Sequence, residues 1–243
     1  MNDLKVWYLF HSGFAVKHKK NVFIFDYYNN IPKNEVFDLN HGVVNPEEIK
    51  DCHVYVFVSH SHYDHYNSII FTWADVISDI HYIVSDDLKL NRDTNAVTIA
   101  LPDQTYHIND ITVETLKSND MGVAYIVKSE GLNIFHSGDL NWWVGSNTTV
   151  NAADELIFKE EYGKLKDHDI DLAFIPVSPK LEENYSLSIA YFLKNIAKEN
   201  CYVFPMHFAL NIRIFQWLER DGLLKDPRLQ TFMHRGLITS TRE

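Results

Sequence analysis

Short apolar runs separated by turns dominate the first part of the chain, and this pattern is typical of antiparallel strands joined in a meander. A polar, turn-rich stretch at 27–50 follows, and we expect it to be a loop with little regular structure. The wholly apolar run at 54–58 then predicts a buried strand. The runs of the predicted meander are residues 6–10, 14–16 and 22–26.

The rest of the chain continues with strands and then alternates strands with helices, an order that predicts two sheets packed face to face with helices outside. The short spacing of the first group of these strands suggests a second meander. No repeat or Pro/Gly-rich linker interrupts the pattern, so residues 1–243 are expected to form a single domain. Strands are predicted at 82–84, 96–100, 111–116, 123–127, 132–135, 172–177 and 202–204, and helices at 67–78, 152–165, 186–196 and 211–219.

Three histidines and one aspartate follow directly on the strand predicted at 54–58. His60, His62 and Asp64 alternate along the chain, and His65 comes next. Alternate side chains of an extended segment share one side, so the first three can converge on one point. Neutral imidazole nitrogens and carboxylate oxygens are the ligands that divalent transition metals prefer. The segment therefore predicts a metal site.

Two later strands also end in residues that can bind a metal. The strand predicted at 132–135 leads into His136 and then Asp139, and the strand at 202–204 leads to His207. Taken alone, a histidine or aspartate at a strand end is more often a capping or solvated residue. Their order after the histidine segment gives them more weight.

The order His-x-His-x-Asp-His, followed by a distant Asp139 and His207, resembles the metallo-β-lactamase superfamily. The segments 9–14 and 23–26 are similar to the first hairpin of its UlaG-like hydrolases. This resemblance implies an α+β fold, a four-layer αββα sandwich of two mixed sheets, with a site for one or two zinc ions. Manganese or iron serves in some branches, but the flavodiiron branch has a glutamate at the position of His62, which favours zinc.

The resemblance also implies a role for each ligand. His60 and His62 would bind the first metal, whereas Asp64, His65 and His207 would bind the second, and Asp139 would bridge the two. The superfamily's third motif, a histidine upstream of the bridging aspartate, has no counterpart here. The stretch 117–122 reads Lys-Ser-Asn-Asp-Met-Gly.

Three alternatives could complete the first site. Ser118, Asn119 or Asp120 would supply an oxygen, or His136 would turn toward the metal, or the first site would bind weakly. We expect a tightly held second metal and a weaker first one.

The resemblance implies hydrolysis of an ester, lactone, amide or phosphoester bond in a small-molecule substrate. A divalent metal lowers the pKa of bound water to about 7, and Asp64 would orient that water or accept its proton. His136 is either an acid or substrate contact beside the ligands or a strand-end histidine bonded to backbone.

The substrate pocket would be shaped by the loops at 27–50 and 140–151. Trp142 and Trp143 are expected either to wall the metals or to pack in the core. Tyr63 would lie at the rim of the site. By contrast, His11 and Asp26 on the first hairpin are expected to be structural.

The charge balance argues against nucleic acid as a partner. With 22 basic and 33 acidic residues, the net charge is −11, which repels phosphate backbones and makes an RNA-processing nuclease the less favoured alternative. A second alternative is a member of the same fold that binds metal in sensing or binding without efficient hydrolysis.

The chain shows no secretion signal and no apolar stretch of bilayer length, so we expect a cytoplasmic protein without a membrane partner. Cys52 and Cys201 are expected to be buried free thiols. The oligomeric state has no sequence signal.

Overall fold

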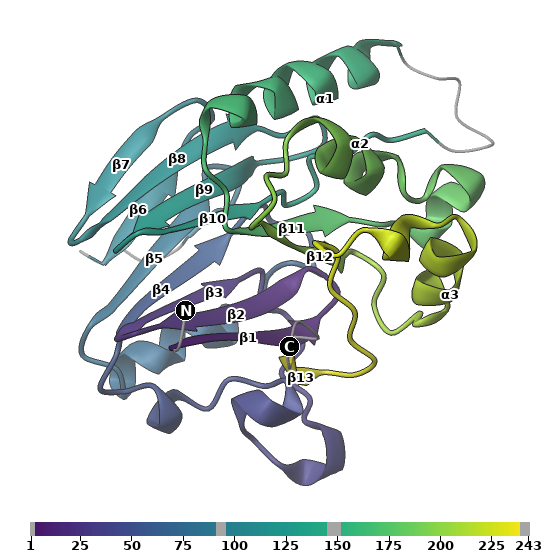
Figure 1. Cartoon of the computed structure of the whole chain (residues 1–243). Helices are drawn as coiled ribbons and strands as arrows, with labels where there is room; N and C mark the ends of the chain where they lie inside the picture. Colours follow the sequence, from purple (N-terminus) through teal and green to yellow (C-terminus); the bar gives the residue numbers. More distant parts are fainter. Residues whose placement is uncertain (1–2, 91–95, 145–151, 239–243) are drawn as a thin grey trace. The chain divides into compact units, whose positions relative to one another are not determined.

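The computed structural model describes residues 3–90, 96–144 and 152–238 (Figure 1). The chain divides into two compact units, each built around one sheet. The first comprises residues 1–100 together with 232–243, and the second comprises residues 101–231. The expectation of a single domain stays a prediction.

A seven-stranded mixed sheet forms the first unit, in the order β13-β1-β2-β3-β4-β5-β6. The predicted meander is confirmed, because β1, β2 and β3 pair antiparallel. The following pairs, from β3 to β6, are parallel. The strands are β1 (Leu4–Phe10), β2 (Gly13–His18), β3 (Asn21–Phe25), β4 (His53–Val58), β5 (Ile80–Ser85), β6 (Val97–Ala100) and β13 (Gly236–Ile238).

The two central strands β3 and β4 set the position of the site. Both are buried along nearly their whole length, as expected for parallel strands covered on both faces. Because they run parallel, their carboxyl ends lie at the same edge of the sheet. Asp26 follows β3, Ser59 follows β4, and the Asp26 N–H donates to the Phe57 carbonyl at 3.0 Å.

The prediction for the strands at 82–84 and 96–100 was right about their existence and wrong about their partners. They do not open a second meander, since β5 and β6 extend the first sheet in parallel. Parallel strands need a crossover, and the one between β4 and β5 contains the 3₁₀ segment Ser68–Asp75, where the sequence predicts a helix. Apolar spacing does not encode strand direction, so the pattern could not separate these arrangements.

The second unit holds a six-stranded mixed sheet in the order β12-β11-β10-β9-β8-β7. Strands β7 to β10 form an antiparallel meander, and β10, β11 and β12 are parallel. The edge strand β7 has no apolar run, and the sequence pattern missed it. The strands are β7 (Thr105–Ile108), β8 (Ile111–Lys117), β9 (Val123–Ser129), β10 (Leu132–His136), β11 (Leu172–Pro176) and β12 (Tyr202–Met206).

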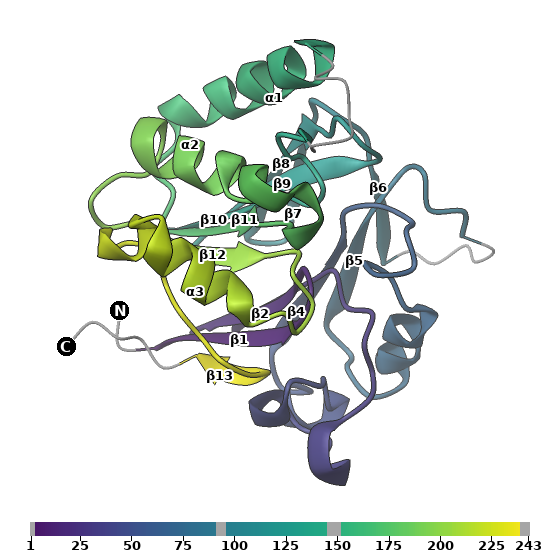
Figure 2. The same cartoon turned by 90° about the vertical axis from the view of Figure 1, so that its right-hand side faces the viewer.

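Three α-helices belong to the second unit, close to their predicted positions: α1 (Ala152–Lys164), α2 (Leu187–Asn195) and α3 (Arg213–Arg220). Phe135 of β10 contacts both Tyr162 of α1 and Phe192 of α2, so these two helices cover the same face of the sheet (Figure 2). Both cysteines are buried and free, as predicted. Among the described helices, none is long and apolar enough to cross a membrane.

Candidate metal centre

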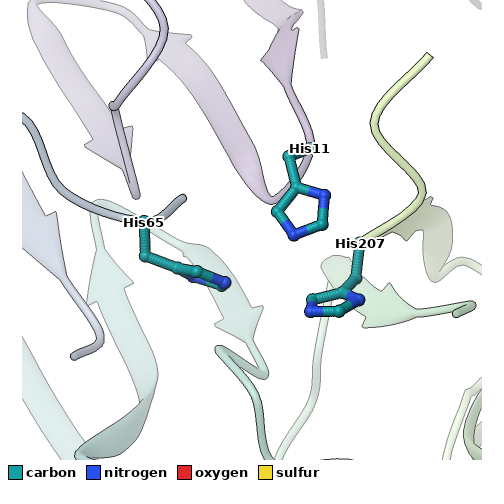
Figure 3. Close-up of side chains that lie close together, drawn as sticks. All are labelled: His11, His65 and His207. Carbon is teal, nitrogen blue, oxygen red and sulfur yellow. The ribbon is translucent and has the colours of Figure 1, made fainter. Parts of the chain in front are cut away.

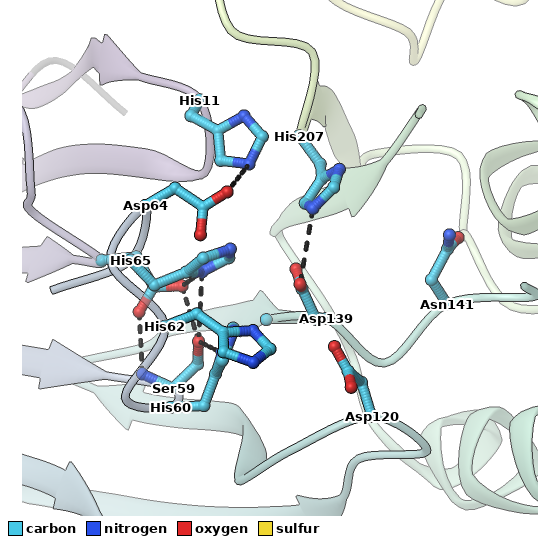
Figure 4. A network of polar contacts seen from close by, with 12 residues as sticks. His11, Ser59, His60, His62, Asp64, His65, Asp120, Asp139, Asn141 and His207 are labelled. Atoms are coloured by element: carbon cyan, nitrogen blue, oxygen red, sulfur yellow. Dashed lines mark hydrogen bonds and ion pairs between the residues drawn. The ribbon is translucent and has the colours of Figure 1, made fainter. Parts of the chain in front are cut away.

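In the first unit, the predicted ligand segment leaves the carboxyl end of β4 and turns at once (Figure 4). His60 and His65 are fully buried. The Nε2 of His60 lies 3.0 Å from the Nδ1 of His62. The alternation of histidines therefore does bring two imidazole nitrogens together.

The buried carboxylate of Asp26 organises this segment. One oxygen, Oδ1, accepts from the Ser59 N–H at 2.7 Å. The other, Oδ2, lies 2.7 Å from the Ser59 hydroxyl and 2.7 Å from the His65 Nδ1. The Ser59 hydroxyl in turn lies 2.9 Å from the His60 Nδ1. One carboxylate is thus connected to two histidines, directly to His65 and through Ser59 to His60.

This network fixes which ring nitrogens can bind a metal. An ionised carboxylate only accepts hydrogen bonds, so the His65 Nδ1 carries its proton. The Ser59 hydroxyl donates its single proton to Asp26, so it accepts a hydrogen bond from the His60 Nδ1. In the neutral form of each ring, the unprotonated nitrogen is therefore Nε2, which is the tautomer that a metal ligand needs, and a carboxylate behind a ligating histidine also raises its basicity.

His11 and Asp64 lie next to each other at the same end of the sheet. The His11 Nε2 is 3.5 Å from the Asp64 Oδ2. The imidazoles of His11 and His65 meet edge to face, with ring centroids 5.5 Å apart (Figure 3). Burial, and then the charge of Asp64, raise the pKa of the nearby Tyr28 to about 12, so this hydroxyl stays protonated at neutral pH.

The second unit presents its own group of ligand-type residues. Asp139, 4% exposed, places its Oδ2 3.4 Å from the Nε2 of His207. Asp120 offers a carboxylate oxygen within 4.8 Å of one from Asp139. Two carboxylates at this spacing repel each other, and a cation bound to both would remove the repulsion.

The turn that carries Asp120 is tied to the turn after Asp139. The Asn119 Nδ2 donates to the Asn141 carbonyl at 2.8 Å, and the Asn141 N–H donates to the Asn119 Oδ1 at 3.2 Å. The Ser118 hydroxyl accepts from the Asp120 N–H at 3.1 Å. Of the three oxygen donors considered for the missing histidine, Ser118 and Asn119 therefore use their side chains on backbone. Asp120 is the one beside Asp139.

The distances within each unit suit ligands of a common ion. Metal–nitrogen and metal–oxygen bonds of about 2.0–2.2 Å place neighbouring ligand atoms roughly 2.8–3.6 Å apart, for angles between square and tetrahedral. The three close pairs are separated by 3.0, 3.5 and 3.4 Å. The chemistry and spacing of the donors therefore fit a divalent transition metal.

His136 ends β10 and is fully buried. Its Nδ1 accepts from the Gly138 N–H at 3.2 Å, and its ring packs against Phe174 with centroids 5.8 Å apart. These contacts hold the Gly138–Asp139 turn. They match the expected strand-end histidine bonded to backbone, and a catalytic role for His136 stays a prediction.

The two tryptophans have different surroundings. Trp142 stacks on Phe158 of α1, with the Lys159 ammonium 4.6 Å above its ring. Trp143 donates from Nε1 to the Asp139 carbonyl at 3.1 Å and lies edge-on to His207. Only Trp143 is thus in direct contact with candidate ligands of the second unit. Tyr63, next to Asp64 in the chain, is 82% exposed, and its place at the rim of the site stays a prediction.

His11 and Asp26 were expected to be structural. The hydrogen bonds of Asp26 to Ser59 and His65 agree with such a role, and for His11 the expectation stays a prediction. The backbones of His11 and Asp26 adopt left-handed conformations, with φ of 57° and 44°, which non-glycine residues rarely take and which cluster at functional sites. Gly13 allows the close approach of the hairpin, because a Cβ there would lie 2.9 Å from the Asp26 carbonyl oxygen. The signal in the sequence was a polar residue directly after each of two strands, β1 and β3, which run in the same direction on either side of β2.

Two mixed sheets, with ligand-type residues following the carboxyl ends of their strands, define an α+β fold, and solved structures of metal-dependent hydrolases have a similar fold. The structure is similar to Igni18, a metallo hydrolase of Ignicoccus hospitalis, with a TM-score of 0.61, 14% identity and 97% of each chain covered. It is also similar to a possible metal-dependent hydrolase of Veillonella parvula, with a TM-score of 0.62, 13% identity and coverage of 98% and 99%.

A third similar structure is CmlA, a diiron β-hydroxylase of Streptomyces venezuelae, with a TM-score of 0.60 and 12% identity, covering 97% of this chain and 54% of that one. In sequence, the chain is 26% identical over 188 residues to a UPF0173 metal-dependent hydrolase of Thermococcus kodakarensis, covering 72% of each. No protein-family model matches the chain. These likenesses confirm the α+β fold and show that the chain resembles metal-dependent hydrolases in sequence and in fold.

Proposed function

We propose that this protein is a metal-dependent hydrolase that cleaves an ester, lactone, amide or phosphoester bond of a small molecule. One or two zinc ions would be bound, since imidazoles outnumber carboxylates among the candidate ligands. Cytoplasmic location and the absence of a nucleic-acid partner stay predictions. The proposed ligands are His60, His62, Asp64, His65, Asp139 and His207, in the roles that the motif order implies, together with Asp120.

The observation that carries the proposal is the buried Asp26 network. A carboxylate that is 1% exposed is costly to bury unless its partners use it. Here it fixes the tautomers of two histidines so that each directs Nε2 away from the network. A purely structural loop has no need of two histidines in the same tautomer.

A bound zinc ion would supply a Lewis acid and lower the pKa of a coordinated water. The chain's own residues have distinct parts in this scheme. Asp64 would hold the attacking water or accept its proton, Asp26 would keep His60 and His65 oriented, and Trp143 would form an apolar wall beside Asp139. The hydroxyl of Tyr28, protonated at neutral pH, is a hydrogen-bond donor near Asp64.

The test combines metal content with turnover. The protein, purified without added metal, is analysed for bound metals by mass spectrometry and assayed on panels of esters, lactones, amides and phosphodiesters. We expect the protein to contain bound zinc and to turn over at least one class of substrate. A chelator should abolish this activity, and added Zn²⁺ should restore it. The variant His60→Gln should lose bound metal and turnover. Its matched control is His53→Gln, since His53 is an exposed histidine of the same unit paired with Asp79.

Bound zinc without turnover on any panel would favour the binding or sensing alternative. A protein that holds no metal after purification and takes up none on titration would contradict the proposal altogether. Turnover of RNA that falls with added salt would instead favour the nuclease alternative.

A further inference from the structure

We propose that His11 is an additional metal ligand, which binds the same ion as Asp64 and His65. This inference rests on the proposed metal-dependent function and adds to it a ligand from the first hairpin, far in sequence from the other donors. The motif that predicts the site does not include this residue.

Distance is the first support. The 3.5 Å between the His11 Nε2 and the Asp64 Oδ2 exceeds the usual 2.7–3.2 Å of an N–H···O hydrogen bond. It falls within the roughly 2.8–3.6 Å expected of two atoms that bind one ion. The pair is therefore spaced as co-ligands and not as donor and acceptor.

The third member of the group is already oriented for binding. His65 commits Nδ1 to Asp26 at 2.7 Å, which leaves Nε2 as its ligand atom. A ring nitrogen of His11 and one of His65 lie within 4.8 Å of each other. Two ligands on opposite sides of an ion are about 4.2 Å apart. The 4.8 Å limit is only slightly larger, so a common ion can reach both rings after a small adjustment of their positions.

The backbone holds His11 in place for this role. The residue sits in the tight connection between β1 and β2, where its N–H donates to the Tyr8 hydroxyl at 2.9 Å. The imidazole is buried, with 6% of the residue exposed. Burial and the backbone hydrogen bond restrict the conformations of the side chain, so the ring nitrogen has a well-defined position, as a metal ligand requires.

His11 changes the donor count of the second metal. Within the first unit alone, His11, Asp64 and His65 supply two imidazoles and one carboxylate. This set matches the two-histidine, one-carboxylate combination of many catalytic metal sites.

The experiment measures metal binding directly, with Zn²⁺ and Co²⁺ as probes. Metal-free wild type, His11→Gly, His11→Gln and the control His53→Gln are titrated with Zn²⁺ against a competing chelator, and the visible absorption of the Co²⁺ forms is recorded. Glycine keeps the left-handed backbone without strain. Circular dichroism and unfolding of the metal-free proteins confirm that each variant is folded.

We expect both His11 variants to bind one ion at least about tenfold more weakly and to show an altered Co²⁺ spectrum. Free imidazole should restore the spectrum of His11→Gly, because it can take the place of the missing ring. Wild type and His53→Gln should behave alike.

Two results would overturn the inference. Unchanged Zn²⁺ affinity and Co²⁺ spectrum in both variants would show that His11 is no ligand. If Zn²⁺ affinity and the Co²⁺ spectrum were those of wild type in His11→Gln but not in His11→Gly, His11 would be a hydrogen-bond donor to Asp64, since glutamine retains an N–H. If wild type itself binds neither metal, the proposed function fails together with the inference.

Discussion

The Asp26 carboxylate and the His65 imidazole form a fully buried pair, with Oδ2 and Nδ1 2.7 Å apart. Since β3 and β4 are parallel neighbours, the pair is positioned by two buried central strands of the first sheet. The contact thus transmits the rigidity of the sheet to a proposed metal ligand.

Asp26→Asn should weaken Zn²⁺ binding by about 10–100-fold. The amide keeps the shape but loses the charge, and it cannot accept through both oxygens. Zn²⁺ affinity from chelator competition is the measurement. Asp79→Asn is the control, because Asp79 also pairs with a histidine of this unit but at an exposed position. Equal affinities in the two variants would contradict the orienting role of Asp26.

His62→Ala should abolish turnover, by a hundredfold or more, while changing the free energy of unfolding of the metal-free protein by less than about 1 kcal/mol. The side chain lies in the turn after β4 and is not part of the core. Activity assays and urea unfolding test the two halves of the prediction. A strongly destabilised variant would mean that the ring is needed for packing.

Asp139→Ala should lower the affinity for both ions, because the residue is predicted to bridge them. Metal content and chelator competition are the measurements. Asp169→Ala serves as the control, since Asp169 is an exposed acid paired with Lys198 in the same unit. Unchanged zinc content in Asp139→Ala would show that the bridging ligand is another residue.

Arg235→Lys should lower the free energy of unfolding by on the order of 2–4 kcal/mol. The guanidinium donates to four backbone carbonyls, and a lysine cannot reproduce this fork. Urea unfolding measures the change, and Arg220→Lys, at an exposed ion pair with Asp221, is the control. A loss no larger than that of the control would contradict this role. The acceptors are the carbonyls of Leu9, Asn29, Ile31 and Gly42.

His168 should make the metal-free protein less stable in acid. Burial lowers the pKa of its imidazole, against the opposing effect of Glu114. The unfolded chain therefore binds more protons between the lowered pKa and about 6.5, and stability falls as the pH drops through this window. Urea unfolding of wild type and His168→Gln should agree near pH 8, and wild type should lose more stability toward pH 5. A constant difference would contradict the prediction.

The sequence predicted the local elements and the central ligand segment well. Alternating histidines after an apolar run carry both a structural and a chemical signal, and the structure places the segment at the end of β4 as expected. The parallel pairing of β5 and β6 was missed, because hydrophobic periodicity reports which faces are buried and not the direction in which a neighbour runs.

Residues that act on the ligands were harder to find. The importance of Asp26 depends on the parallel pairing of β3 with β4, which brings it to Ser59 across a long stretch of sequence. Asp120 was named among three possible oxygen donors, but the choice among them depends on the contacts between the Asn119 side chain and the Asn141 backbone. Such relationships are tertiary and leave no spacing signal. The role proposed for His11 rests on distances that no sequence pattern supplies.

Strand β13 pairs with β1 although it is made only after the entire second unit. During synthesis on the ribosome, β1 therefore lacks its partner strand β13 while more than half of the polypeptide is still being made. The order of translation differs from the order of assembly, so stalled or shortened chains should expose β1 to intermolecular pairing and aggregation.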